Sequence, residues 1–152
     1  MTMRPILAAA AVLMTPCVAD AAPGGAVRVQ RDAETLLFLL PVTIGSTTVR
    51  MIVDTGASNT ILTPDDAARM RGVVSTGTVT GAGITGTARM KVVRLPDLQA
   101  AGRRLGVRTV VVGMKGIPYS LLGQAELRDL GPITIDGDVM TLGGPIRRGT
   151  AR

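Results

Sequence analysis

The sequence lacks histidine and tryptophan altogether, and Cys17 is its single cysteine. Without histidine, neither a Ser-His-Asp triad nor a Cys-His pair can form, and a zinc site loses its commonest ligand. Paired carboxylates are then the main remaining way to hydrolyse a substrate. The composition therefore directs attention to the 11 acidic residues, and we expect neither a metal nor another cofactor.

Aromatic residues are almost absent as well, since Phe38 and Tyr119 are the only two. The net charge is +6, from 17 basic and 11 acidic residues, and this balance alone could suggest a nucleic-acid partner. However, the arginines are scattered along the chain, and two aromatic side chains cannot form a stacking platform for single strands. The composition favours a solvated basic surface, and we expect no nucleic-acid partner.

The first 21 residues have the pattern of a secretory signal peptide. Arg4 supplies a positive charge, residues 6–14 are apolar, and Ala19-Asp20-Ala21 places small residues where a signal peptidase cleaves. Cleavage after Ala21 is preferred to cleavage after the next residue, which would leave Pro23 immediately downstream. The sequence therefore predicts an exported protein, periplasmic or secreted.

Two alternatives to cleavage are a membrane anchor and a lipoprotein. The apolar run is well short of the roughly 20 residues that a spanning helix needs, so membrane association is expected only if the segment is not cleaved. Residues 14–16 before Cys17 form a poor lipobox. Because Cys17 leaves with the signal segment, the mature protein would have no disulfide and no thiol chemistry.

The most informative stretch is residues 51–58, with the sequence MIVDTGAS. Three apolar residues predict a buried strand that ends at the carboxylate of Asp54. Thr55-Gly56 then predicts a tight turn, because glycine tolerates backbone angles that other residues adopt at a cost. Asp-Thr-Gly also occurs as an ordinary turn without chemistry, so its interpretation depends on the rest of the chain.

This stretch resembles the active-site loop of the retropepsin-like aspartic proteases, where Asp-Thr-Gly-Ala-Ser is the usual form. Residues 81–86 form a glycine-rich stretch between two β-rich segments and resemble the family's flap, which closes over substrate. Leu121-Leu122-Gly123 resembles the apolar-apolar-Gly element, whose strand crosses beside the catalytic loop. The resemblance extends over roughly residues 27–142 and is strongest at residues 52–58.

The resemblance implies a mostly β fold with a single retropepsin-like acid protease domain. The domain would close like a β-barrel, with one short helix after the active-site loop and one near the C-terminus. Residues 22–26 would be a linker before the domain, and residues 143–152 a flexible basic tail after it. One copy of Asp-Thr-Gly cannot supply two carboxylates that share a proton, so the implied enzyme is a two-fold homodimer.

The resemblance also implies a role for each residue of the loop. Asp54 from each subunit would activate the attacking water, and the Thr55 hydroxyl would hydrogen-bond across the two-fold axis. Gly56 would let backbone N–H groups approach the carboxylate, and Ser58 would support Asp54 from the outer side. The implied catalytic residue is Asp54, the loop supports are Thr55, Gly56, Ala57 and Ser58, the flap and substrate-binding residues are Gly81, Ala82, Gly83, Ile84, Thr85 and Gly86, and the supports behind the loop are Leu121, Leu122 and Gly123.

Two functions follow from these features. The first is an aspartic endopeptidase that hydrolyses peptide bonds in a peptide or protein substrate, and the second is a catalytically silent module for peptide binding or assembly. The intact Asp54-Thr55-Gly56 favours the peptidase, because a binding module has no reason to keep a desolvated acid pair. The sequence names no physiological substrate.

Periodicity and turn residues predict the elements of this domain. Thr63-Pro64 followed by two acids is a strong helix start, and Asp136-Gly137 between alternating segments is a strong hairpin signal. We expect strands over residues 27–30, 36–44 with an irregularity at Pro41, 47–53, 61–62, 73–80, 87–95, 105–112 and 133–142, a connection over 96–105, and helices over 65–70 and 124–130.

Overall fold

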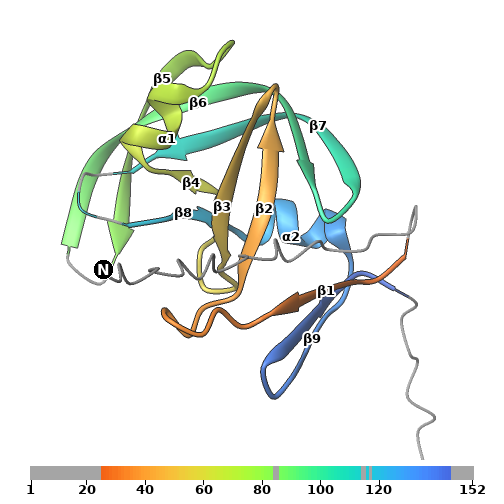
Figure 1. Cartoon of the computed structure of the whole chain (residues 1–152). Coiled ribbons are helices and arrows are strands. Elements are labelled where there is room, and N and C mark those ends of the chain that lie inside the picture. The colour runs from red at the N-terminus through yellow and green to blue at the C-terminus, as the bar shows by residue number, and fades with distance from the viewer. Residues whose placement is uncertain (1–24, 84–85, 114–115, 117, 145–152) are drawn as a thin grey trace, which may run out of the picture.

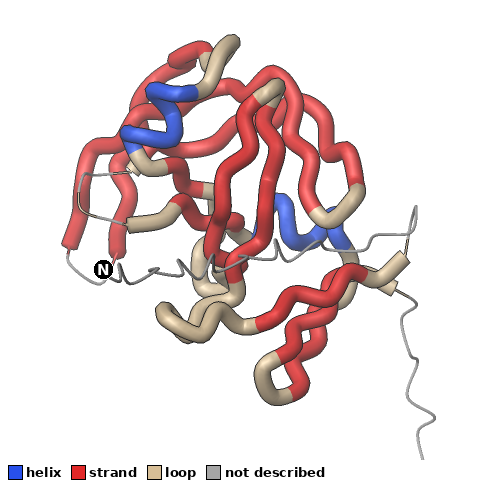
Figure 2. The backbone as a smooth tube through the Cα atoms, in the orientation of Figure 1, coloured by secondary structure: helices blue, strands red, loops and turns tan. Residues whose placement is uncertain are grey.

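The computed structural model describes residues 25–83, 86–113, 116 and 118–144. Strands dominate this part of the chain, as Figure 2 shows. The elements in chain order are β1 (Val27–Gln30), β2 (Leu39–Ile44), β3 (Thr47–Val53), β4 (Ile61–Leu62), α1 (Pro64–Arg69), β5 (Val74–Gly83), β6 (Gly86–Ala100), β7 (Arg103–Val112), β8 (Ser120–Leu122), α2 (Gln124–Leu130), β9 (Ile133–Asp136) and β10 (Val139–Leu142).

Several predicted features lie outside the described residues: the signal segment, most of the linker, residues 145–152 of the tail, and Ile84 and Thr85 of the flap. In the described part, no helix has the length and apolar character needed to cross a membrane.

The larger sheet closes into a barrel. Its strand order is β2-β3-β8-β4-β7-β6, and β2 pairs again with β6, so these strands form a ring from which β5 extends as the hairpin partner of β6 (Figure 1). Alternate residues of β3 are buried, with Val49, Met51 and Val53 inside the barrel, as period-two alternation requires. The mostly β, barrel-like fold with two short helices is confirmed.

A smaller sheet, in the order β1-β10-β9, packs against the lower end of the barrel in Figure 1. Val27 and Val29 of β1 and Met140 and Leu142 of β10 are buried in the same core as the barrel side chains. The two sheets therefore share one continuous core.

The β5–β6 hairpin is longer than the sequence predicted. Pairing continues through the glycine-rich stretch to Gly83 and Gly86, so the strands expected over residues 73–80 and 87–95 are wrong in their bounds. The connection expected over residues 96–105 is also wrong, because β6 continues past Pro96 to Ala100. The ladder with β7 tolerates the proline through an irregularity between Leu95 and Leu98.

The strand expected over residues 36–44 begins only at Leu39. Leu36 has a φ of 59°, in a turn that reverses the chain before β2. The expected irregularity at Pro41 is wrong, because Pro41 pairs in register with Arg50 of β3. The pairing of β2 with β6 begins at Val42, so the missing N–H of Pro41 leaves no ladder partner unpaired.

Helix α1 starts as its sequence predicts, although its bounds lie one residue earlier than expected. The Thr63 side chain caps it by accepting a hydrogen bond from the backbone N–H of Asp66 at 3.0 Å. Asp66 is buried, and its carboxylate accepts a hydrogen bond from the Ser120 hydroxyl at 2.5 Å. This contact ties α1 to the start of β8.

The remaining elements are close to their predicted positions. Helix α2 has the predicted bounds of residues 124–130. Strands β9 and β10 form the predicted hairpin, but Asp136 is the last residue of β9 and pairs with Val139, so Gly137 and Asp138 make the turn.

Candidate active site

Strand β3 delivers Asp54 to the end of the barrel. The strand pairs with β2 on one side and runs parallel to β8 on the other. This parallel ladder continues one residue past the strand, because the backbone N–H of Asp54 donates to the Leu122 carbonyl at 3.0 Å. The backbone of Asp54 is therefore fixed by the sheet, while its side chain is only half-buried.

The turn after β3 folds back onto the Asp54 carboxylate. The backbone N–H of Gly56 donates to Asp54 Oδ1 at 2.8 Å, and the N–H of Ala57 donates to the Asp54 carbonyl at 3.4 Å. A Cβ atom at Gly56 would lie 3.2 Å from Asp54 Oδ1, so glycine permits this close approach. In the described part of the chain, Oδ2 has no hydrogen-bond partner, so this oxygen is available to a reacting group.

The start of helix α2 holds the outer part of the same loop. The first N–H groups of a helix have no partner within the helix, and here the loop carbonyls accept them. The N–H of Gln124 donates to the Ala57 carbonyl at 2.8 Å, and the N–H of Ala125 donates to the Ser58 carbonyl at 3.2 Å. The side-chain amide of Gln124 adds a hydrogen bond to the Thr55 carbonyl at 2.5 Å.

Gly123 lies where β8 meets α2, directly against the loop. A Cβ atom at this position would lie 2.4 Å from the backbone carbon and oxygen of Asn59 and 2.9 Å from the Ala57 carbonyl oxygen. These atoms belong to backbone and cannot rotate away, so the close approach requires glycine. This contact gives a physical reason for the glycine of the apolar-apolar-Gly element.

Two buried polar residues that the sequence analysis missed complete the support. Thr60 and Glu126 are 1% and 3% exposed, and the Thr60 hydroxyl donates to the Glu126 carboxylate. The same hydroxyl oxygen accepts the backbone N–H of Gly123 at 3.0 Å. The sequence signal for a buried acid is Glu126 itself, which stands beside Leu127 in the short apolar face of α2. Nothing in the neighbouring sequence identifies Thr60, 66 residues earlier, as its partner.

The structure brings together the predicted residues of the loop and those behind it. Leu121 and Leu122 lie on β8, which pairs with β3 and, at Leu121, also with β4. Thr55 and Ser58 are exposed, and among the described residues Ser58 is held through its backbone carbonyl and not through its hydroxyl.

The described flap residues, Gly81, Ala82, Gly83 and Gly86, lie at the tip of the β5–β6 hairpin. Strands β3 and β5 run in the same direction in Figure 1, so the hairpin tip and the Asp54 loop lie at the same end of the barrel. Among the described residues, no hydrogen bond joins the tip to the loop.

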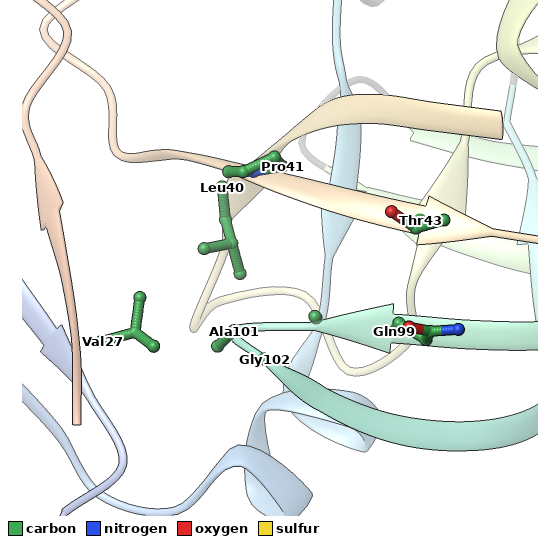
Figure 3. A pocket seen from close by; sticks show the side chains of 8 residues that line it. Val27, Leu40, Pro41, Thr43, Gln99, Ala101 and Gly102 are labelled. Carbon is green, nitrogen blue, oxygen red and sulfur yellow. The ribbon is translucent and has the colours of Figure 1, made fainter. Parts of the chain in front are cut away.

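A groove of about 290 Å³ lies elsewhere on the barrel (Figure 3). It lies between β1, β2 and the turn after β6, with Val27, Leu40, Pro41, Gln99 and Ala101 in its lining. No titratable side chain lines it, so the groove offers shape and apolar contact but no acid or base. Over residues 25–83, 86–113, 116 and 118–144, no group of three or more His, Cys, Asp or Glu side chains could hold a metal ion.

Comparison with known proteins agrees with this geometry. The family model described as Aspartyl protease matches residues 40–125, from β2 to the first turn of α2. No curated protein matches the chain in sequence.

Many solved structures are similar to the chain, and two of them illustrate the likeness. One is a retropepsin-like aspartic protease from Rickettsia conorii, with 21% identity, a TM-score of 0.60, and coverage of 78% of this chain and 89% of that one. The other is EIAV protease complexed with the inhibitor HBY-793, with 22% identity, a TM-score of 0.59, and coverage of 68% of this chain and 97% of that one. The retropepsin-like fold predicted from the sequence is confirmed.

Proposed function

The chain belongs to the aspartyl protease family, and from this premise we propose that it is an aspartic endopeptidase that works as a homodimer. The observation that carries the proposal is the placement of Asp54. Its backbone is fixed by the β3–β8 ladder, one carboxylate oxygen accepts the Gly56 N–H at 2.8 Å, and the other oxygen is available. A carboxylate held in this way is preorganised for chemistry on a bound peptide.

Hydrolysis would use two Asp54 carboxylates that share one proton. The ionised carboxylate of one subunit removes a proton from a water molecule, and the oxygen of this water attacks the peptide carbonyl carbon. The protonated carboxyl of the other subunit donates its proton to the carbonyl oxygen. As the C–N bond breaks, one hydroxyl of the tetrahedral intermediate returns its proton to the carboxylate that had protonated the carbonyl oxygen, and the leaving amine takes up the proton that was removed from water.

The second subunit is required because each chain has one Asp-Thr-Gly sequence. The exposed Thr55 side chain supports this assembly, because its hydroxyl is available to hydrogen-bond across a two-fold axis to the partner loop. Gln124, which holds the Thr55 carbonyl, would keep that hydroxyl in place. The dimer would thus place two rigid loops, and not two mobile side chains, against each other.

Substrate binding would use the hairpin that ends at the same side of the barrel as the Asp54 loop. The tip residues Gly81, Ala82, Gly83, Ile84, Thr85 and Gly86 would cover an extended peptide, which pairs with backbone groups as an added strand. Small residues and glycines at the tip would let the hairpin approach the peptide backbone closely. The substrate class is a peptide or an unfolded protein segment.

The test is cleavage of an unfolded casein-like protein by the purified mature chain, compared with an Asp54→Asn control. Asparagine keeps an oxygen for the Gly56 N–H but cannot act as the base, so activity should fall by roughly 100-fold or more. Equal activity of the two proteins would contradict the proposal. Binding of the substrate by both proteins with no cleavage by either would favour the catalytically silent binding module.

We also propose that the protein is exported, because residues 1–21 have the pattern of a cleaved signal peptide. N-terminal sequencing of the protein from fractionated cells should find a mature chain that begins at or near Ala22 in the periplasmic or secreted fraction. Met1 retained on soluble cytoplasmic protein would contradict this proposal.

A further inference from the structure

Glu126 is a buried acid to which the proposed chemistry gives no role. A buried carboxylate is costly unless hydrogen bonds replace the water that it loses. Glu126 is 3% exposed, and its carboxylate accepts the hydroxyl proton of Thr60, which is 1% exposed. This pair lies directly behind the loop that carries Asp54, so it can affect the loop without touching a substrate.

The contacts of Thr60 and Glu126 form a closed ring with Gly123. The Gly123 N–H donates to Thr60 Oγ1 at 3.0 Å, and the Thr60 hydroxyl donates to Glu126. The backbone N–H of Glu126 then donates back to the Gly123 carbonyl at 3.2 Å. The backbone of Thr60 is fixed on its other side, because its carbonyl accepts the Val111 N–H at 3.1 Å.

We propose that Glu126 is a positioning residue for the aspartate loop and acts through the hydroxyl of Thr60. A hydroxyl has one proton and can point it in several directions. With Glu126 as its acceptor, the proton points away from Gly123, and the Thr60 lone pairs face the Gly123 N–H. Gly123 is then held against Asn59 and Ala57, and the loop that presents Asp54 has one position. The catalytic consequence of this ring rests on the proposed function.

Ser120 and Asp66 form a matched comparison within the same domain. They are also a buried hydroxyl and a buried carboxylate, and Ser120 Oγ donates to Asp66 Oδ2 at 2.5 Å. Their contacts involve α1, Thr63 and the start of β8, and none of their hydrogen bonds reaches residues 54–60. Loss of this second pair should lower stability without loosening the aspartate loop.

The first experiment measures amide hydrogen exchange of the loop and of Gly123 by NMR in variants that keep a native circular dichroism spectrum. Thr60→Val and Glu126→Leu remove the ring, whereas Thr60→Ser and Glu126→Gln keep its donor and acceptor. We expect exchange at Gly56 and Gly123 to be roughly tenfold faster in the first two variants, because each leaves a buried hydrogen-bonding group without its partner. The Ser and Gln variants, and the Ser120→Ala control, should exchange as the wild type does at these amides.

The second experiment measures kcat and KM for peptide cleavage at saturating dimer concentration. Thr60→Val should lower kcat by roughly tenfold or more, because small displacements of a catalytic group are costly. The KM should stay unchanged, because Thr60 and Glu126 are buried and cannot reach the peptide. Thr60→Ser and Glu126→Gln should keep most of the wild-type kcat.

The outcomes separate this proposal from the proposed function. Wild-type exchange at Gly56 and Gly123 in Thr60→Val would overturn the role of the ring, and so would equally fast exchange in Ser120→Ala. If the wild type shows no Asp54-dependent cleavage, the proposed function fails, while the exchange experiment still decides whether Glu126 positions the loop. If Glu126→Leu does not fold, the comparison of Thr60→Val with Thr60→Ser gives the decision.

Discussion

At the scale of single residues, the absence of one methyl group at Gly123 determines how the loop packs. The backbone of Asn59 lies 2.4 Å from the position that a Cβ atom would take there. No rotamer change can relieve such a clash, because the opposing atoms belong to the main chain. The distance between α2 and the Asp54 loop is therefore set by the smallest residue available.

Gly123→Ala should lower the free energy of unfolding by about 1–3 kcal/mol, the usual range for overpacking, and should also lower proteolytic activity. Urea denaturation and a peptide-cleavage assay measure the two effects. Gly77→Ala is the matched control, because nothing lies within 4 Å of its Cβ position, and this substitution should change neither quantity appreciably. Equal effects of the two substitutions would show that the close contact with Asn59 is unimportant.

At the scale of elements, one carboxylate organises the connection between β1 and β2. Asp32 Oδ1 accepts the backbone N–H of Thr35 at 3.0 Å and its hydroxyl at 2.9 Å. Asp32 Oδ2 accepts a hydrogen bond from Arg50 on β3 at 2.8 Å. These contacts, the Thr35 backbone N–H first among them, lower the pKa of Asp32 to about 2.

This lowered pKa gives a pH-dependent prediction. A carboxylate with a lower pKa in the folded state stabilises the fold above its unfolded pKa of about 4, and the contribution is lost as the pH falls towards 2. Asp32→Asn should therefore unfold at lower urea concentration than the wild type at pH 6. The difference should shrink between pH 4 and pH 2. Asp136→Asn, at an exposed position in the β9–β10 hairpin, should show little change at any of these pH values.

The prediction for Asp32 would be contradicted by a difference between the variant and the wild type that stays constant from pH 6 to pH 2. Such a result would mean that shape, and not charge, makes Asp32 important in this turn.

Elements with local signals were predictable from the sequence. Residues 47–53 lie between the turn residues Gly45-Ser46 and Thr55-Gly56, and residues 124–130 are bounded by Gly123 and by Gly131-Pro132, so both elements were predicted with the correct bounds. Strand β6 was not, because Pro96 has the character of a break and only the ladder with β7 shows that the strand continues. Tertiary pairing thus overrides a local signal at this position.

The candidate site also has one part that the sequence predicts and another part that only the fold brings together. Asp54 and its turn are contiguous in the sequence, so the motif could be recognised from residues 51–58 alone. Thr60 and Glu126 could not be paired from the sequence, because their contact depends on β8 and α2 folding back beneath the loop. The exposure of the Ser58 side chain was equally unpredictable. It depends on the fold, in which the backbone carbonyl of Ser58, and not its hydroxyl, binds helix α2.

At the scale of the whole molecule, the proposed dimeric site would make activity depend on assembly, because each chain contributes one Asp54. Activity per subunit should fall on dilution, because separated subunits cannot share a proton between two carboxylates. Far below the dissociation constant of the dimer, the total rate should rise with the square of the protein concentration. Initial rates over a dilution series, with sedimentation at the same concentrations, measure this dependence.

An excess of the Asp54→Asn chain gives the matching control, since mixed dimers should lower the activity of the wild-type chain. A rate that stays proportional to concentration throughout, or active protein that sediments only as a monomer, would contradict the dimeric site.

The pairing of β1 with β10 also has a consequence for how the chain folds. Val27 pairs with Leu142, so the first and last described strands are neighbours in the smaller sheet. Contacts between such distant parts of a chain form late, because a long loop must close first. A chain synthesised from its N-terminus cannot complete this sheet, or the core beneath it, until Leu142 has emerged from the ribosome. Late completion keeps this sheet unfolded for longer, which suits the export proposed for the chain.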